Sequence, residues 1–263
     1  MGGTIIMKQK ILQVQGLRKH FGKHGSMTKA LDGMTFDVLE GEFLGIMGKS
    51  GCGKTTLLNC IATALKPTEG KILLNGEDIG GFDDRRLAEY RGSRIGYLYQ
   101  DFELLDNLTG RENITLPLAI HGKEEGIEAD RLPELVDYLE IGEVLDKFPS
   151  QMSGGEKQRV AAARALIPDP GIVIADEPTG ALDTENARAL MQKLNGLNRE
   201  FGRTILMVTH DAGAASYCSR ILFMQDGYIF HELRREFPQE SQKDYYERIL
   251  AAMAQLGGSA DVF

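Results

Sequence analysis

The stretch from Gly48 to Thr56 has the residue types and the spacing of a site that could hold phosphate groups. It reads GKSGCGKTT and satisfies the pattern GxxxxGK[ST]. Its glycines let the backbone turn so that successive N–H groups converge on an anion. Lys54 can then reach the β- and γ-phosphates of a nucleotide, and Thr55 offers a hydroxyl group to Mg²⁺. We expect the whole stretch to contact the nucleotide: Gly48, Lys49, Ser50, Gly51, Cys52, Gly53, Lys54, Thr55 and Thr56.

The segments on either side of this loop have the order that such a site requires. The apolar run 42–47 is typical of a buried strand, and helical periodicity runs from Lys54 to Leu65. A helix that begins at the loop adds the positive end of its dipole to the anion site. A glycine-rich turn without a ligand is the weaker alternative, because the pattern lies in the order strand, loop, helix.

Other polar residues stand at the ends of further strands of buried type. The apolar run 172–175 leads directly into Asp176 and Glu177, and packing alone does not place two acids at the end of a buried strand. Gln100 follows the strand predicted at 95–99, and His210 follows the strand predicted at 204–208. The two acids are therefore candidate functional groups.

A second anion site is predicted where a helix begins at Ser153. The sequence Ser153-Gly154-Gly155-Glu156 opens an alanine-rich helical segment. A serine followed by two glycines leaves free N–H groups at the positive end of a helix dipole. An ordinary serine N-cap without a ligand is the alternative.

Composition and charge narrow the class of protein. The 263 residues suit one domain, 1–263, and carry a net charge of −8 that argues against non-specific binding to nucleic acid. No apolar run approaches the ~20 residues that a membrane span requires, and the N-terminus lacks the apolar core of a signal peptide. Three cysteines without the spacing of a disulfide scaffold fit a reducing cytosol. We therefore expect a cytoplasmic protein.

The rest of the chain predicts two strands before the loop and helices after it. Strands are expected at 11–21 and 30–38, and Phe21 is our candidate for stacking on an adenine ring, against the alternative of a core phenylalanine. A helical lobe is expected at about 101–165. An amphipathic helix is expected at about 241–256, docked through Tyr245, Ile249, Met253 and Leu256.

Four apolar residues, Phe102, Leu104, Leu105 and Leu108, are scattered among acids after Gln100. Such a patch could face a partner protein. A small local core beneath the following helices is an equally good interpretation of the same residues.

Taken together, these motifs occur in the order found in ATP-binding cassette (ABC) ATPases, and the chain resembles that family over nearly its whole length. The motifs are the loop at 48–55, Gln100, Ser153-Gly154-Gly155-Glu156, Asp176-Glu177, Ala181-Leu182-Asp183 and His210. The resemblance implies an α/β fold: a P-loop NTPase core with a mixed sheet, an N-terminal antiparallel β region and an inserted α-helical lobe. It also implies ATP and Mg²⁺ as ligands.

The resemblance further implies a role for each candidate side chain. Asp176 would hold the hydration shell of Mg²⁺, and Glu177 would polarise the attacking water. Gln100 would touch Mg²⁺ and the water, and His210 would bind the γ-phosphate. Phosphoryl transfer depends mainly on positioning and charge stabilisation, which agrees with this division of labour.

The resemblance also implies a head-to-tail homodimer. Ser153 and Gly155 of one copy would close over ATP held by the other, and Asp183 would lie at the seam between them. Two positions depart from the family's LSGGQ motif, because Met152 replaces its leucine and Glu156 its glutamine. We expect neither change to abolish hydrolysis.

Within the family, the segments 101–106, 175–183 and 208–218 are similar to the bacitracin-exporter type. Members of that type power an integral-membrane permease and defend bacteria against peptide antibiotics that attack the cell wall. Lipoprotein-releasing, macrolide-export and cell-division ATPases share most of these motifs. A regulatory role is therefore an alternative, in which the ATPase signals through a membrane partner to a hydrolase or a sensor kinase. We expect a peripheral protein at the inner face of the membrane and no nucleic-acid partner.

Overall fold

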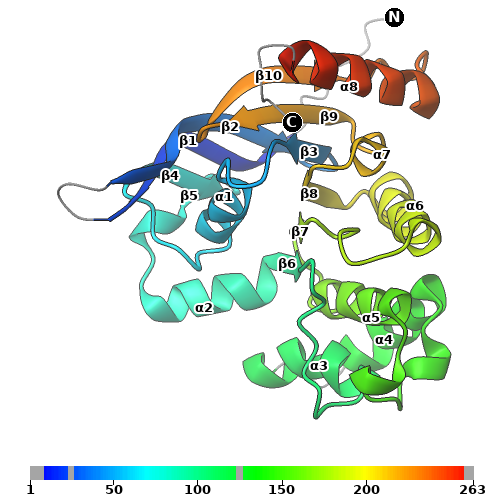
Figure 1. Ribbon diagram of the computed structural model, residues 1–263. Coiled ribbons are helices and arrows are strands. Elements are labelled where there is room, and N and C mark those ends of the chain that lie inside the picture. The colour runs from blue at the N-terminus through cyan, green and yellow to red at the C-terminus, as the bar shows by residue number, and fades with distance from the viewer. Residues whose placement is uncertain (1–8, 23–26, 123–126, 258–263) are drawn as a thin grey trace, which may run out of the picture.

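The structure is a computed structural model that describes residues 9–22, 27–122 and 127–257, with the backbone alone at 127–129 and 256–257 (Figure 1). Two sheets and a group of helices make up this part of the chain. The strands are β1 (Lys10–Phe21), β2 (Thr28–Leu39), β3 (Phe43–Met47), β4 (Glu69–Leu74), β5 (Glu77–Asp78), β6 (Ile95–Leu98), β7 (Ile172–Asp176), β8 (Thr204–Thr209), β9 (Arg220–Gln225) and β10 (Tyr228–Arg234). The helices are α1 (Lys54–Ile61), α2 (Asp84–Ser93), α3 (Gly110–His121), α4 (Ile127–Leu139), α5 (Gly154–Leu166), α6 (Thr184–Phe201), α7 (Ala212–Ala215) and α8 (Gln242–Gly257).

The larger sheet has six strands in the order β10-β9-β3-β8-β7-β6. Its strands from β9 to β6 run parallel, and β10 pairs antiparallel with β9 at one edge. Every residue of β3 and of β8 is buried, which explains their unbroken apolar sequences. The carboxyl ends of β6, β7 and β8 therefore meet at one edge, where the candidate residues follow them.

The smaller sheet is antiparallel, with the order β2-β1-β4-β5. It covers one face of the larger sheet together with α1, because Leu12 and Val14 of β1 share a buried cluster with Leu57 of α1 and Leu206 of β8. The strands predicted at 11–21 and 30–38 are β1 and β2. The α/β fold with a mixed sheet and an N-terminal antiparallel region is thus confirmed.

The first helix is shorter than predicted. Helical periodicity extends to Leu65, but α1 ends at Ile61, and Thr63 has a left-handed backbone with φ +59°. The N–H groups of Ala64 and Leu65 both donate to the carbonyl of Asn59 instead of continuing the helix. A local turn therefore overrides the apolar pattern of these last residues.

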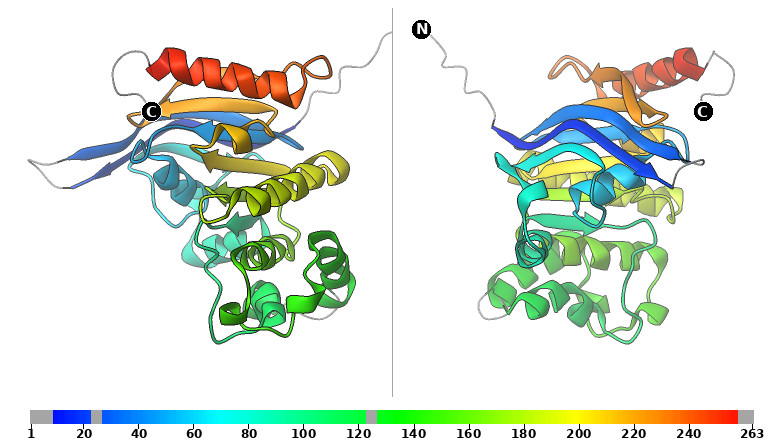
Figure 2. Two further views of the ribbon diagram at one scale, coloured as in Figure 1. Left: turned by 45° about the vertical axis from the view of Figure 1, so that its right-hand side comes forward. Right: turned by 90° about the vertical axis from the view of Figure 1, so that its left-hand side faces the viewer.

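Helices α3, α4 and α5 group together at one end of the molecule, and α8 lies across the opposite end (Figures 1 and 2). The three helices share one buried apolar cluster, to which Ile114, Leu135 and Val160 belong. Asn113 on α3 is fully buried and bonds through its amide to the main chain of 105–109. On α8, Tyr245 and Ile249 are fully buried, and Met253 packs against the same core. The side chain of Leu256 lies outside the described residues. The division of the chain into one domain with a lobe at about 101–165 stays a prediction.

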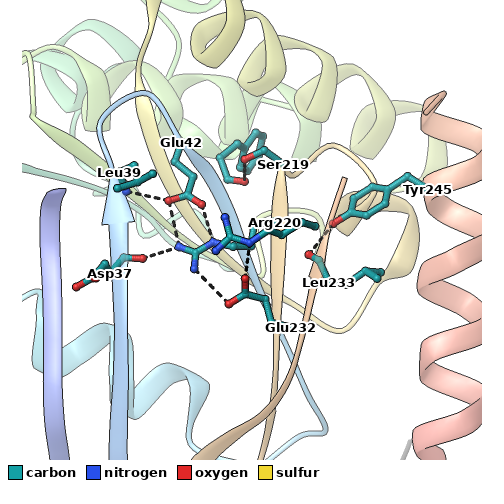
Figure 3. A network of polar contacts seen from close by, with 10 residues as sticks. Asp37, Leu39, Glu42, Ser219, Arg220, Glu232, Leu233 and Tyr245 are labelled. Carbon is teal, nitrogen blue, oxygen red and sulfur yellow. Dashed lines mark hydrogen bonds and ion pairs between the residues drawn. The ribbon is translucent and has the colours of Figure 1, made fainter. Parts of the chain in front are cut away.

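A buried ion pair between Arg220 and Glu42 ties the two sheets together (Figure 3). Each residue is 7% exposed, and the guanidinium Nε lies 2.7 Å from Glu42 Oε1. Arg220 also donates to the carbonyl of Asp37 on β2, while Glu42 Oε2 accepts the N–H of Leu39 at 2.8 Å. Because each charge has several partners, the pair fixes the start of β3 against β2 and β9.

Candidate functional site

The phosphate loop predicted at Gly48–Thr56 joins β3 to α1. Gly51 and Gly53 have left-handed backbones with φ of +80° and +108°. A Cβ at Gly53 would lie 2.2 Å from the carbonyl oxygen of Ala30, and one at Gly48 would lie 2.3 Å from that of Met224. Glycine is therefore required at both positions by packing against β2 and β9, in addition to any contact with phosphate.

Lys54 points its ammonium group into the curve of this loop. Its side chain is 5% exposed, and Nζ donates to the carbonyl oxygens of Gly48 at 2.7 Å and Lys49 at 3.0 Å. Glu177 Oε1 lies 3.6 Å from the same nitrogen. The loop thus holds a buried cation at the N-terminal end of α1, where an anionic phosphate would be attracted to it.

The side chains of Thr55 and Asp176 come together from α1 and the end of β7. Thr55 Oγ1 donates a hydrogen bond to Asp176 Oδ1, and Tyr97 OH donates one to Asp176 Oδ2; the donor–acceptor distance is 3.4 Å in both. Burial raises the pKa of Asp176 and the neighbouring Glu177 raises it further, whereas the hydrogen bond from Thr55 lowers it. A hydroxyl and a carboxylate are the oxygen ligands with which proteins hold Mg²⁺ beside a phosphate. The chemistry of this pair therefore fits the ion.

Glu177 stands beside Asp176 with a strained backbone, φ +45°. Its N–H donates to the carbonyl of Val208 at 3.0 Å, which fixes it to the end of β8. Its Oε2 lies 2.8 Å from Nδ1 of His210, and His210 is 66% exposed. A carboxylate held between Lys54 and His210 is placed to orient a water molecule next to a bound phosphate.

Gln100 is exposed and lies against a neighbouring loop. A Cβ at Gly180 would be 3.0 Å from its Nε2. Within the described part of the chain, its side chain makes no hydrogen bond to Asp176 or Glu177. Its predicted contact with Mg²⁺ and water stays a prediction.

The segment Ser153–Glu156 begins α5 with a capping box. Ser153 Oγ accepts the N–H of Glu156 at 3.2 Å, and Glu156 Oε2 accepts the N–H of Ser153 at 2.6 Å. The hydrogen bond from the Ser153 backbone N–H lowers the pKa of Glu156, against the opposing effect of burial. The glutamine of the family's motif could make the same reciprocal contact, so Glu156 can replace it without loss of the capping box. Ser153 and Gly154 remain exposed.

Asp183 caps the next helix, α6. Its Oδ1 accepts the N–H of Asn186 at 2.9 Å, and its Oδ2 accepts from the Asn186 amide at 2.7 Å. The same amide reaches the start of α5, because a Cβ at Gly155 would lie 2.0 Å from Asn186 Oδ1. The Ser153–Glu156 segment and the Asp183 turn are therefore in direct contact within one chain.

This contact predicts different outcomes for two adjacent glycines. Gly155→Ala must displace Asn186 and disturb the cap of α6, so we expect a loss of about 1–3 kcal/mol in the free energy of unfolding. Gly154→Ala is the matched control, since a Cβ there would meet nothing nearer than Leu182 at 3.8 Å. Denaturant unfolding of both variants measures the difference. Equal losses would contradict the proposed contact.

Phe21 lies at the end of β1 with 41% of its surface exposed. Lys19 Nζ is 5.0 Å from the centre of its ring. The ring is partly exposed, and its stacking on adenine stays a prediction.

Sequence reasoning missed three polar residues that shape this site: Tyr97, Gln158 and Asn186. Tyr97 reads as an ordinary strand residue, and Asn186 as a residue of a helical first turn. Gln158 gives a weak signal, because it is a polar residue on a helix whose neighbours at 160–163 are apolar. Only the assembled fold brings them to the motifs.

A phosphate loop between a buried parallel strand and a helix, facing a pair of carboxylates at the end of another strand of the same sheet, β7, defines a P-loop nucleoside triphosphatase. The family model described as ABC transporter matches residues 31–180. The chain belongs to this family and is an ABC-type ATPase.

Three curated relatives and one solved structure give the context. The chain is 46% identical to the uncharacterized ABC transporter ATP-binding protein YvcR of Bacillus subtilis, over 96% of this chain and 97% of that protein. It is 41% identical to the bacitracin export ATP-binding protein BceA of Halalkalibacterium halodurans, over 94% and 97%. It is 40% identical to the lipoprotein-releasing system ATP-binding protein LolD 1 of Rhodopseudomonas palustris, over 83% and 98%.

The fold is similar to that of the ATP-binding cassette MJ0796, which was solved as a dimer in a post-hydrolysis state bound to ADP and phosphate. The TM-score is 0.78 at 37% identity, over 86% of this chain and all of that one. In the described part of our chain, no helix is both long and apolar enough to cross a bilayer.

Proposed function

We propose that this chain is the ATP-hydrolysing subunit of a bacterial transporter and drives a separate membrane permease by ATP-dependent closure of a homodimer. The observation that carries the proposal is the junction of Lys54, Glu177 and His210 at the end of the phosphate loop. There the ammonium group of Lys54, which would bind the phosphates, lies 3.6 Å from the carboxylate of Glu177, which would orient the water. The post-hydrolysis dimer of MJ0796 supports the closure step.

Within one copy, the phosphate loop, Lys54 and Thr55 bind the nucleotide phosphates, and Phe21 covers the base. Thr55 and Asp176 hold Mg²⁺, which neutralises charge on the phosphate oxygens when it is bound. Glu177 orients the attacking water, and His210 contacts the γ-phosphate. Gln100 contacts the ion and the water.

The second copy supplies Ser153, Gly154 and Gly155, whose N–H groups close over the same nucleotide. In this chain, Leu182, Ala181 and Phe102 lie near the Cβ position of Gly154, and Asn186 lies near that of Gly155, while Ser153 and Gly154 stay exposed. Glu156 supports the site through its capping box, and Asp183 lies at the seam between the copies. We infer that the start of α5 serves the nucleotide of the partner copy.

The substrate class we propose is a peptide antibiotic that acts on the cell wall, so that the transporter confers resistance. The match to BceA supports this assignment. It covers 94% of this chain, so it must include part of α8, which begins at Gln242. The match to LolD 1 runs along 98% of that shorter protein but over 83% of this chain. Lipoprotein release is therefore the second candidate function, and signalling through the permease to a sensor kinase is a third.

Recovery of the chain from bacterial membranes, followed by identification of the co-purifying protein, tests the proposal. A permease with a large extracellular domain, whose deletion sensitises the cells to bacitracin, is the expected result. A lipoprotein-releasing or cell-division membrane protein would instead select the alternative. Recovery in the cytosol without any membrane partner would contradict a transport role.

The apolar patch after Gln100 is divided by the fold. Phe102 and Leu104 are partly buried against the core cluster that the helical lobe shares with the larger sheet, whereas Leu105 is 45% exposed. Leu105 is thus the residue of this patch that can contact a cytoplasmic helix of the permease. For Phe102 and Leu104, this packing favours the alternative interpretation of the patch as a local core.

We expect Leu105→Asp to leave ATPase activity in solution within about twofold, because exposed substitutions rarely disturb the fold. The same change should abolish co-purification with the permease and any stimulation of ATPase activity by it. Met27→Asp, at a residue that is 61% exposed beside β2, is the control and should do neither. Insolubility of the Leu105 variant alone would assign this residue to the local core.

A further inference from the structure

Gln158 lies on α5, and its side-chain amide is fully buried. Its Nε2 donates to the carbonyl oxygen of Pro178 at 2.7 Å and to that of Tyr99 at 3.2 Å. Its Oε1 is also buried and has no hydrogen-bond partner among the described residues. A buried amide with an unpaired oxygen costs stability, so packing alone does not account for a glutamine here.

The two carbonyl groups that Gln158 binds belong to residues next to the candidate catalytic side chains. Tyr99 immediately precedes Gln100, and Pro178 immediately follows Glu177. The backbone of Glu177 is left-handed, a conformation that persists only when the surroundings hold it in place. One amide therefore anchors both segments from the same side.

A second side chain of α5 holds the first of these segments further along. Arg164 donates from Nη2 to the carbonyl of Phe102 at 2.7 Å and from Nη1 to that of Glu103. Phe102 and Glu103 also have left-handed backbones. The segment 99–103 thus follows α5 through side chains that are bonded to its main chain.

The same helix begins at Ser153, where its capping box fixes the first turn. A helix moves as a rigid rod over such a short length, so a displacement of Ser153 carries Gln158 with it. The hydrogen bond to Pro178 therefore joins the first turns of α5 to the backbone next to Glu177.

We propose that Gln158 is a positioning residue for ATP hydrolysis, which fixes the backbone of Glu177 and Gln100 and links both to the nucleotide-facing end of α5. This inference rests on the proposed role of Glu177 in hydrolysis. It does not involve Lys54 or the phosphate loop, so it separates turnover from nucleotide binding.

The test is a set of variants assayed for kcat, for the dissociation constant of ATP and for thermal unfolding. Gln158→Met fills the same space without a donor, and a displacement of about 1 Å at the reacting groups lowers turnover by roughly 10²-fold. We expect that fall in kcat together with an ATP dissociation constant within about twofold of the parent value. Gln158→His retains a ring N–H at a similar reach and should recover at least about tenfold of the loss.

Tyr138→Phe is the matched control, since it removes another hydrogen bond between the lobe and the rest of the chain, one that is partly buried. Tyr138 OH donates to the carbonyl of Lys193 at 2.7 Å, far along the chain from the carboxylates. We expect it to lower the unfolding temperature and to leave kcat within about twofold. An equal kcat in the Gln158 and Tyr138 variants, assayed well below both unfolding temperatures, would overturn the proposal.

A double-mutant cycle with Glu177→Gln separates this inference from the proposed function, using single-turnover rates. If Gln158 acts through Glu177, Gln158→Met should lower the rate of the Glu177→Gln protein by less than about threefold. A full hundredfold loss on that background would refute a role through Glu177. Unchanged hydrolysis by Glu177→Gln alone would refute the proposed function instead, whatever Gln158 does. If Gln158→Met does not fold, Gln158→Leu, which also lacks a donor, carries the same cycle.

Discussion

Lys54→Ala is expected to lower ATP turnover by at least roughly 10²- to 10³-fold, the loss typical when one donor to a transition-state anion is removed. The ammonium group is the buried cation of the loop, within 3.0 Å of two loop carbonyls and 3.6 Å of Glu177. Its charge-assisted bonds to phosphate have no substitute, because the backbone N–H groups that remain are neutral. The affinity for ATP should fall with it.

The fold should survive this change, since among the described residues Nζ bonds only to the loop itself and to Glu177. Calorimetric titration with ATP and a thermal melt measure affinity and stability on the same preparation. Lys243→Ala removes the same charge from an exposed position on α8 and serves as the control. Parent-like turnover in the Lys54 variant would remove the lysine from the mechanism, and a melt shifted in both variants would point to a general effect of charge.

The elements that position the site follow from local sequence signals. Unbroken apolar runs at 43–47 and 204–208 indicate strands buried on both faces, which in turn indicates a parallel sheet. The Asn75-Gly76 and Asp226-Gly227 pairs predict hairpin turns, and all four residues have the left-handed backbone that such turns need. These predictions succeed because each depends on residues close together in the chain.

Other features depend on contacts between distant segments and could not be predicted. β3 lies between β8 and β9 in the sheet, although it precedes both by more than 150 residues in the chain. Local sequence signals cannot predict a pairing between such distant segments. The left-handed backbone of Glu177 has no sequence signature, because glutamate rarely adopts it without support from neighbouring segments. The division of the patch after Gln100 likewise follows from how Asn113 and Arg164 hold that segment.

The sequence also suggested a purely anion-binding role for the glycines of the Ser153–Glu156 segment. The fold gives Gly155 a second reason, since Asn186 fills the space that a side chain would need. Gly154 has no such neighbour and stays exposed. Residue type alone cannot separate two such requirements, because both are met by the absence of a Cβ.

Glu177→Gln is expected to trap an ATP-bound dimer and to lower turnover by roughly 10²- to 10⁴-fold, the range of general acid–base contributions. Glutamine keeps the size of the side chain and can still face His210 and Lys54, but it is no longer a base. Nucleotide contacts of the phosphate loop, Asp176 and the partner's Ser153–Gly155 segment are untouched. Binding and closure should therefore persist while hydrolysis stops.

A shift of the open-to-closed equilibrium from 1:99 to 99:1 needs about 5.5 kcal/mol of differential binding. Contacts to phosphate from two chains can supply this, whereas one chain makes the same contacts in both states. Light scattering with and without Mg-ATP measures the mass, and Glu89→Gln, an exposed change on α2, is the control. A trapped dimer with hydrolysis reduced as stated is the expected result. A monomer at saturating ATP would mean that closure requires the permease, and a dimer that hydrolyses at the parent rate would exclude Glu177 as the base.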